Sequence, residues 1–120
     1  MWYQLILKTP HHITKEVVKV STKTVQEVLD DIINYIQNHG GEFINWYIGI
    51  AKSPLKRLFN DHNVIEENDF WIFRKTETTD DARFIESTII ETCGTDGGTR
   101  GGDANTVFIY GYKKSSATKP

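Results

Sequence analysis

The sequence predicts a single α+β domain in which a small, mostly antiparallel sheet is flanked by about three helices. Segments rich in aromatic and β-branched residues, typical of strands, alternate with segments whose apolar residues recur at helical spacing. The length of 120 residues suits one domain, and no internal repeat divides the chain. We expect this domain to span residues 1–113 and residues 114–120 to form a flexible tail.

Two strands and one helix are predicted in the first third of the chain. Residues 1–7 and, more weakly, residues 15–21 are rich in aromatic and branched side chains. Thr24 and Glu27 have the spacing of a capping box, which begins a helix that stops at the Gly40–Gly41 pair. Its apolar positions are Val25, Val28, Leu29, Ile32 and Ile36.

Residues 42–51 form the clearest predicted strand. Its alternation separates a core-like face from a mixed one. The core-like face holds Ile44, Trp46, Ile48 and Ile50, and the other face holds Phe43, Asn45, Tyr47 and Gly49. Ser53 as N-cap and Pro54 as first residue then begin a short helix, in which Arg57 lies opposite the buried side that includes His62.

The second half predicts a strand, a helix, an irregular segment and a last strand. Residues 70–76 are the strand, and the helix covers about residues 80–93. The glycine-rich residues 94–103 predict no regular structure, and residues 106–114 are the last strand.

Glu86 interrupts the apolar face of the predicted helix 80–93. The helical spacing places it within an arc formed by Ala82, Ile85, Ile89, Ile90 and Cys93. A carboxylate on the core side costs several kcal/mol unless a cation or hydrogen bonds meet it. Two interpretations remain open: a salt bridge or a position at the helix edge, and a metal ligand or general base in a cleft.

Composition excludes several classes of protein. With 14 lysine and arginine residues against 16 aspartate and glutamate residues, the chain lacks the strong positive charge of a protein that coats nucleic acid. Any contact with DNA must therefore use a local patch. One cysteine excludes an internal disulfide and a cysteine-based zinc cluster. No apolar run is long enough to span a membrane and no signal peptide is evident, so we expect a cytoplasmic protein without a membrane partner.

Two separated motifs resemble those of GIY-YIG nucleases. The stretch Tyr47-Ile48-Gly49, followed by a helix with Arg57 and then by His62, is similar to the YIG strand and arginine helix of that family. Ala82 and Glu86, four residues apart and followed by two isoleucines, are similar to the family's glutamate helix. The two matches have the family's order and a strand between them.

The resemblance implies a metal-dependent endonuclease that hydrolyses DNA phosphodiester bonds. Glu86 would bind one Mg²⁺ or Mn²⁺ ion, Arg57 would contact the scissile phosphate, and Tyr47 would lie beside the attacking water. His62 is a further catalytic candidate. The candidates for contact with phosphate or nucleic acid are Lys52, Lys56, Arg57, Arg100 in the glycine-rich segment, and Asn105. A protein partner could supply specificity for the DNA.

The first motif of the family, a GIY strand about ten residues before YIG, is missing, because the helix that begins at Thr24 occupies its place. Its tyrosine is usually a principal catalytic group. Tyr3 is our preferred replacement because it keeps the family's strand order, with the intervening segment as an insertion. Tyr110 or Tyr112 would replace it if the last strand pairs beside the YIG strand in a permuted arrangement. The missing motif also leaves the alternative of an inactive module that binds nucleic acid or a protein.

Overall fold

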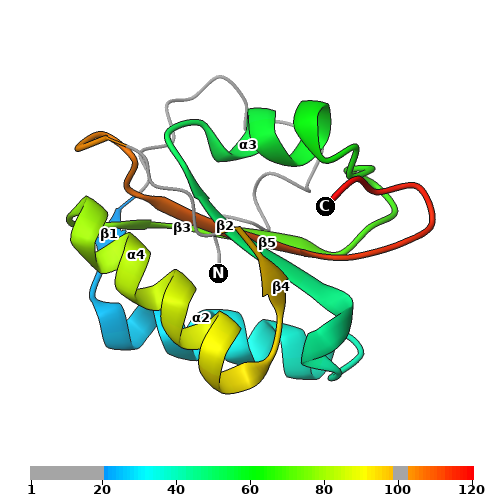
Figure 1. Cartoon of the computed structure of the whole chain (residues 1–120), viewed down its shortest axis with the longest axis horizontal. Coiled ribbons are helices and arrows are strands. Elements are labelled where there is room, and N and C mark those ends of the chain that lie inside the picture. The colour runs from blue at the N-terminus through cyan, green and yellow to red at the C-terminus, as the bar shows by residue number, and fades with distance from the viewer. Residues whose placement is uncertain (1–20, 99–102) are drawn as a thin grey trace.

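The computed structural model, which describes residues 21–98 and 103–120, has an α+β architecture with helices on both faces of one sheet (Figure 1). The helices α2 and α4 cover one face, and the shorter α3 covers the other. The elements in chain order are β1 (Thr22–Lys23), α2 (Val25–Asn38), the 3₁₀ turn η1 (Phe43–Asn45), β2 (Trp46–Ala51), α3 (Pro54–Lys56), the π-helical turn η2 (Arg57–Asp61), β3 (Trp71–Thr76), α4 (Thr79–Thr88), the π-helical turn η3 (Ile89–Cys93), β4 (Asp96–Gly97) and β5 (Phe108–Lys113). The predicted α+β class, with one sheet and about three helices, is confirmed.

The sheet is mixed, so the expectation of a mostly antiparallel sheet was only partly right. Its five strands have the order β1-β3-β5-β2-β4. The central strand β5 is antiparallel to both β2 and β3, whereas the two-residue edge strands β1 and β4 are parallel to their neighbours. Between β1 and β3 the chain passes through α2, β2 and α3, and between β2 and β4 it passes through α3, β3 and α4. Long connections of this kind allow the parallel pairs.

The first predicted helix begins and ends where its capping signals lie. The Glu27 backbone N–H donates to Thr24 Oγ1 at 3.2 Å, and the Thr24 N–H donates to Glu27 Oε1 at 2.9 Å. The glycines after α2 have positive φ angles, +121° at Gly40 and +73° at Gly41, which other residues rarely adopt. Local sequence therefore determines both ends of α2.

The other two helices depart from the expected boundaries. Pro54 begins α3 as predicted, but the Ser53 side chain makes no capping hydrogen bond. The Thr78 side chain caps α4 by accepting a hydrogen bond from the Asp81 N–H at 3.1 Å, so the helix begins at Thr79, one residue before the predicted start. Both helices end in π-helical turns.

The strand predicted for residues 42–51 begins only at Trp46. Residues Phe43–Asn45 form η1 instead, and Ile44, expected in the core, is 64% exposed. The ladder explains this difference, because Trp46 pairs with Lys113, the last residue of β5. Just past the ladder, the Lys114 N–H still donates to the Asn45 carbonyl at 2.7 Å, but the residues before Asn45 have no partner on β5.

Two other sequence expectations concern segments outside the long strands. The glycine-rich segment was expected to be irregular, but Asp96 and Gly97 pair with Tyr47 and Ile48 as β4, which corrects that prediction. The strands predicted at residues 1–7 and 15–21 lie outside the described residues except for Ser21, which precedes β1.

The sheet separates two hydrophobic clusters. The cluster under α2 and α4 includes Ile32, Ile48, Ile85 and Ile109, all with no exposed surface. The cluster under α3 is aromatic and contains Trp71, Phe73, Tyr110 and Tyr112 together with Leu58. The tyrosines of β5 therefore lie on the α3 face, the face that also receives Tyr47.

The segment 114–120, for which the sequence predicts a flexible tail, makes specific contacts with the residues that follow η2. The Lys119 N–H donates to the His62 carbonyl at 2.8 Å, and Asn63 Nδ2 donates to the Ala117 carbonyl at 2.9 Å. Thr118 is 8% exposed. Of the helices in the described part of the chain, none combines the length and hydrophobicity that a membrane span requires.

Candidate active site

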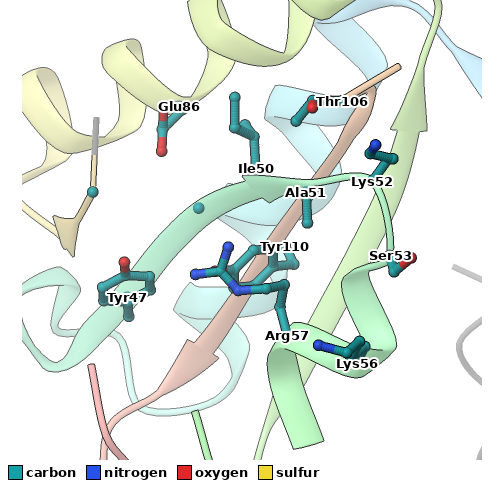
Figure 2. A pocket seen from close by; sticks show the side chains of 12 residues that line it. Tyr47, Ile50, Ala51, Lys52, Ser53, Lys56, Arg57, Glu86, Thr106 and Tyr110 are labelled. Atoms are coloured by element: carbon teal, nitrogen blue, oxygen red, sulfur yellow. The ribbon is translucent and has the colours of Figure 1, made fainter. Parts of the chain in front are cut away.

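A cavity of about 670 Å³ opens at the edge of β2 beside the short strand β4, and Figure 2 shows side chains that line it. The short strand β4 pairs only with Tyr47 and Ile48, so the segment Gly49–Ala51 has no paired strand on that side among the described residues. At this open edge, a side chain from α4 on one face of the sheet can reach the same cavity as side chains from α3 on the other face. The cavity is lined by Tyr47, Gly49, Ile50, Ala51, Lys52, Ser53, Lys56, Arg57, Glu86, Gly98, Thr106 and Tyr110.

Glu86 presents a buried carboxylate to this cavity. Its residue is 4% exposed, and we find no hydrogen bond or ion pair to its side chain within residues 21–98 and 103–120. Burial raises the pKa of Glu86 to about 7, although the nearby charge of Arg83 opposes the shift. The salt-bridge interpretation therefore has no support in the described residues, and the position is not at an exposed edge.

Arg57 enters the cavity from the opposite side of β2. Figure 2 shows the Arg57 guanidinium and the Glu86 carboxylate directed toward the space between them. The guanidinium carbon lies 5.9 Å from the centre of the Tyr110 ring, a cation–π arrangement. Asp61 Oδ2 is 3.0 Å from Arg57 Nε, but the N–H is not aligned for a hydrogen bond, so the contact is an ion pair only.

Three tyrosines and one histidine form a cluster under Arg57. The Tyr47 ring is stacked on Tyr112, with centroids 5.3 Å apart, and more loosely on Tyr110 at 6.4 Å. His62 lies against Tyr47 with centroids 4.7 Å apart. Burial raises the pKa of both Tyr110 and Tyr112 above the ordinary tyrosine value, so both phenols are protonated at neutral pH.

His62 is buried behind the cavity and does not line it. Its Nε2 atom is 2.7 Å from the Tyr110 hydroxyl, and its Nδ1 atom is 2.7 Å from the Lys119 carbonyl oxygen. Burial lowers the pKa of His62, an effect that the charge of Arg57 reinforces, although the Lys119 hydrogen bond opposes it. The imidazole is therefore neutral at pH 7, with a hydrogen on one ring nitrogen and a lone pair on the other.

Gly49 is needed because Tyr110 lies directly across the sheet from it. The two residues are paired in the ladder, and a Cβ atom at position 49 would lie 2.6 Å from the Tyr110 hydroxyl oxygen. This distance is too short for any side chain to fit without moving the phenol.

We expect Gly49→Ala to lower the free energy of unfolding by about 1–3 kcal/mol, because the Tyr110 ring must shift in a filled core. Urea denaturation measures this loss, and the hydroxyl should also lose its contact with His62. An unchanged unfolding curve would contradict the close approach that we describe.

The structure brings most of the predicted site residues together. The cavity described above is lined by Tyr47, Lys52, Lys56, Arg57 and Glu86. Tyr110, which the sequence left as an alternative to Tyr3, lines it too, whereas Tyr112 does not.

The remaining predicted residues lie elsewhere. Asn105 is in an exposed turn, where its N–H donates to Asp103 Oδ1 at 2.9 Å, and its neighbour Thr106 lines the cavity instead. Tyr3 and Arg100 lie outside the described residues. Sequence reasoning did not identify Ser53, Gly98 or Thr106. Ser53 could have been recognised as a site residue because it lies between Lys52 and the first residue of the helix. No local sequence pattern marks Gly98 or Thr106 as residues of the cavity.

The lysines at the rim are partly neutralised by acidic neighbours. Lys52 Nζ lies 3.4 Å from Asp103 Oδ2, and Lys56 Nζ lies 3.8 Å from Asp61 Oδ1. All four side chains are more than 40% exposed, so solvent screens these pairs and a phosphate can displace the carboxylates.

A metal site built from several protein ligands is not found in the described residues, which contain no group of three or more His, Cys, Asp or Glu side chains placed to hold an ion. Among the described residues that line the cavity, Glu86 is the one that carries a carboxylate, a ligand suited to a divalent cation.

Comparisons of the chain with protein-family models, with curated proteins and with solved structures give no match.

Proposed function

We propose that this protein is a GIY-YIG-like, metal-dependent endonuclease that hydrolyses DNA phosphodiester bonds. The observation that carries the proposal is the cavity in which Glu86, a carboxylate that makes no ion pair among the described residues, faces Arg57, Tyr47 and Tyr110. A phosphodiester with a bound divalent ion would bring both the positive charge that Glu86 lacks and an anion for Arg57.

The position of β5 supports Tyr110 as the replacement for the missing GIY tyrosine. This strand lies antiparallel beside the YIG strand β2, and Tyr110 pairs with Gly49 and lines the cavity. In the chain, β5 comes after both β2 and the glutamate helix α4, whereas the GIY strand of the family comes before the YIG strand. The proposal is therefore a permuted arrangement, which the sequence left as the second choice after Tyr3.

The residues present fit a single divalent ion. Mg²⁺ and Mn²⁺ prefer carboxylate oxygens and are often held by one or two carboxylates together with water and substrate phosphate. Glu86 would be the protein ligand, because its buried carboxylate faces the cavity and makes no ion pair within the described residues. When bound, the ion supplies polarisation of the scissile phosphate and neutralises charge on the leaving oxygen.

The chain's own residues divide the remaining tasks. Arg57 holds the phosphate with its planar fork of donors. Tyr110 takes a proton from the attacking water at its hydroxyl oxygen while it passes its own proton to His62 Nε2, which lies 2.7 Å away. Tyr47, whose hydroxyl points into the same space in Figure 2, positions the water.

Binding of DNA would depend on a small group of cations. Lys52, Lys56 and Arg57 lie together on the α3 side of the cavity, whereas the whole chain has a net charge of −2. This local charge can hold the backbone next to the scissile bond but gives no sequence specificity. A protein partner or an unusual DNA structure would supply that specificity.

The proposal is tested with supercoiled plasmid and branched DNA in the presence of Mg²⁺ or Mn²⁺. We expect nicking by the wild type, its loss in EDTA, and a decrease of about a hundredfold in Arg57→Gln, because a preorganised contact to the reacting phosphate is removed. Lys75→Gln, which makes the same charge change at a residue outside the cavity, should retain the wild-type rate.

Each alternative gives a different result in this assay. Salt-sensitive binding without any product would indicate the inactive nucleic-acid-binding module. If the protein neither binds nor cleaves DNA at low salt, the proposed function is overturned, and a protein partner becomes the ligand to seek. Equal nicking by wild type and Arg57→Gln would point to a contaminating nuclease.

A further inference from the structure

The C-terminal segment determines which nitrogen of His62 carries the proton. The Lys119 carbonyl oxygen lies 2.7 Å from Nδ1, and a carbonyl can only accept a hydrogen bond. Nδ1 must therefore carry the hydrogen. The Tyr112 hydroxyl oxygen lies 3.1 Å from the same nitrogen, so it accepts at most a second and weaker hydrogen bond from Nδ1–H.

This tautomer fixes the direction of the neighbouring hydrogen bond. A neutral imidazole with its proton on Nδ1 has a free lone pair on Nε2, so the Tyr110 hydroxyl at 2.7 Å donates to it. In the other tautomer, Nε2–H would donate to Tyr110, and the Nδ1 lone pair would face the carbonyl oxygen without a proton between them. Tyr110 would then have no acceptor on His62.

Several hydrogen bonds hold the Lys119 carbonyl in place. The Lys119 N–H donates to the His62 carbonyl at 2.8 Å, so both backbone groups of Lys119, its N–H and its carbonyl, are hydrogen-bonded to His62. Asn63 Nδ2 donates to the Ala117 carbonyl at 2.9 Å. Thr118 Oγ1 accepts the Ser115 N–H at 2.9 Å and donates to the Ser115 carbonyl at 3.1 Å, which closes the turn before Lys119.

We propose that residues 115–119 are a positioning segment, which keeps His62 in the Nδ1–H tautomer so that Nε2 can accept the Tyr110 proton. The catalytic meaning of this arrangement rests on the proposed function, whereas the tautomer itself does not. The segment acts through backbone groups, so its effect does not depend on the Lys119 side chain. A segment that the sequence predicts as a tail thus becomes a part of the site.

The first test is nuclear magnetic resonance of the full chain without DNA. Multiple-bond ¹⁵N–¹H correlation distinguishes the two tautomers, and the His62 signals are those that disappear in His62→Gln. The wild type should show Nδ1–H. In the double variant Asn63→Gly/Thr118→Val, the ratio of Nε2–H to Nδ1–H should rise about tenfold, the change expected when one hydrogen bond is lost.

The variants are chosen to leave the rest of the fold intact. Asn63 has a φ of +59°, which glycine adopts without strain, so Asn63→Gly removes the amide and keeps the backbone. If the double variant does not fold, Asn63→Gly alone should show a smaller shift in the same direction. Ser116→Ala, in the same segment at an exposed position, is the matched control and should keep the wild-type tautomer.

The second test is the rate of plasmid nicking. The double variant should be about tenfold slower, and Ser116→Ala should be unchanged. A wild-type His62 with its proton on Nε2, or a folded double variant with an unchanged tautomer ratio, would overturn the positioning role. If the tautomer responds as expected but the wild type cleaves no DNA, the positioning segment stands and the proposed function fails.

Discussion

Glu86→Gln is expected to slow DNA cleavage by about a thousandfold and, at pH 8, to make the folded protein more stable than the wild type. The first effect follows because an amide cannot hold a divalent ion as a carboxylate does. The second follows because the buried carboxylate makes no ion pair in the described residues and the charge of Arg83 offsets only part of the cost of burial, so the charge of Glu86 destabilises the fold. Opposite effects on activity and stability are typical of a functional group and not of a structural one.

The sign of the stability change follows from the pKa of Glu86. Burial raises that pKa from 4.5 to about 7, so the folded protein binds the proton more tightly than the unfolded chain does. The protonated carboxyl therefore contributes its full stability below pH 4.5, and this contribution is lost as the pH rises from 4.5 through about 7. The shift corresponds to about 3 kcal/mol, which we reduce to about 2 kcal/mol because the carboxylate meets water in the cavity.

Urea denaturation at pH 4 and pH 8 measures this difference. Glu86→Gln should gain about 2 kcal/mol over the wild type at pH 8 and almost none at pH 4. Glu91→Gln, at an exposed position farther along the same helical segment, is the control and should change neither stability nor cleavage. Retained cleavage in Glu86→Gln would remove this carboxylate from the reaction.

Tyr110→Phe should reduce cleavage by about a hundredfold, whereas Tyr112→Phe should reduce it by less than about threefold. Both tyrosines are buried on the same face of β5 and both contact His62. Tyr110 alone lines the cavity and donates to Nε2, so its hydroxyl is the one that lies on the proton path. The two variants remove the same hydroxyl group from two neighbouring positions, of which only position 110 lines the cavity.

Single-turnover cleavage with saturating protein measures the two rates without the influence of product release. Tyr110→Phe should also lose about 1–2 kcal/mol of stability, because His62 Nε2 is left buried without a donor. If Tyr112→Phe is the slower variant, the direction that we assign to the His62 hydrogen bonds is wrong. If both variants cleave normally, Tyr3 becomes the tyrosine to test.

Features encoded over a few neighbouring residues were predictable from the sequence. The capping box of Thr24 and Glu27 gave the start of α2, and Pro54 gave the start of α3. The position of Glu86 on the buried side of its helix followed from helical spacing alone. In each case the signal and the structure lie within the same turn or two of the chain.

Features that depend on distant partners could not be predicted in this way. Ile44 continues an ideal strand pattern, but β5 ends before it could pair with that position. The choice between Tyr3 and Tyr110 depended on which strand lies beside β2, and no local pattern contains that information. The hydrogen bonds of residues 117–119 likewise depend on His62 and Asn63, more than fifty positions earlier.

The central place of β5 also determines when the sheet can form. The strands β2 and β3 do not pair with each other, and both are joined through β5, the last of the described strands along the chain. A ribosome therefore makes both neighbours before it makes the strand that unites them. Until then their unpaired edges are open to association with other chains, so this protein should depend on chaperones during synthesis more than a hairpin-built domain does.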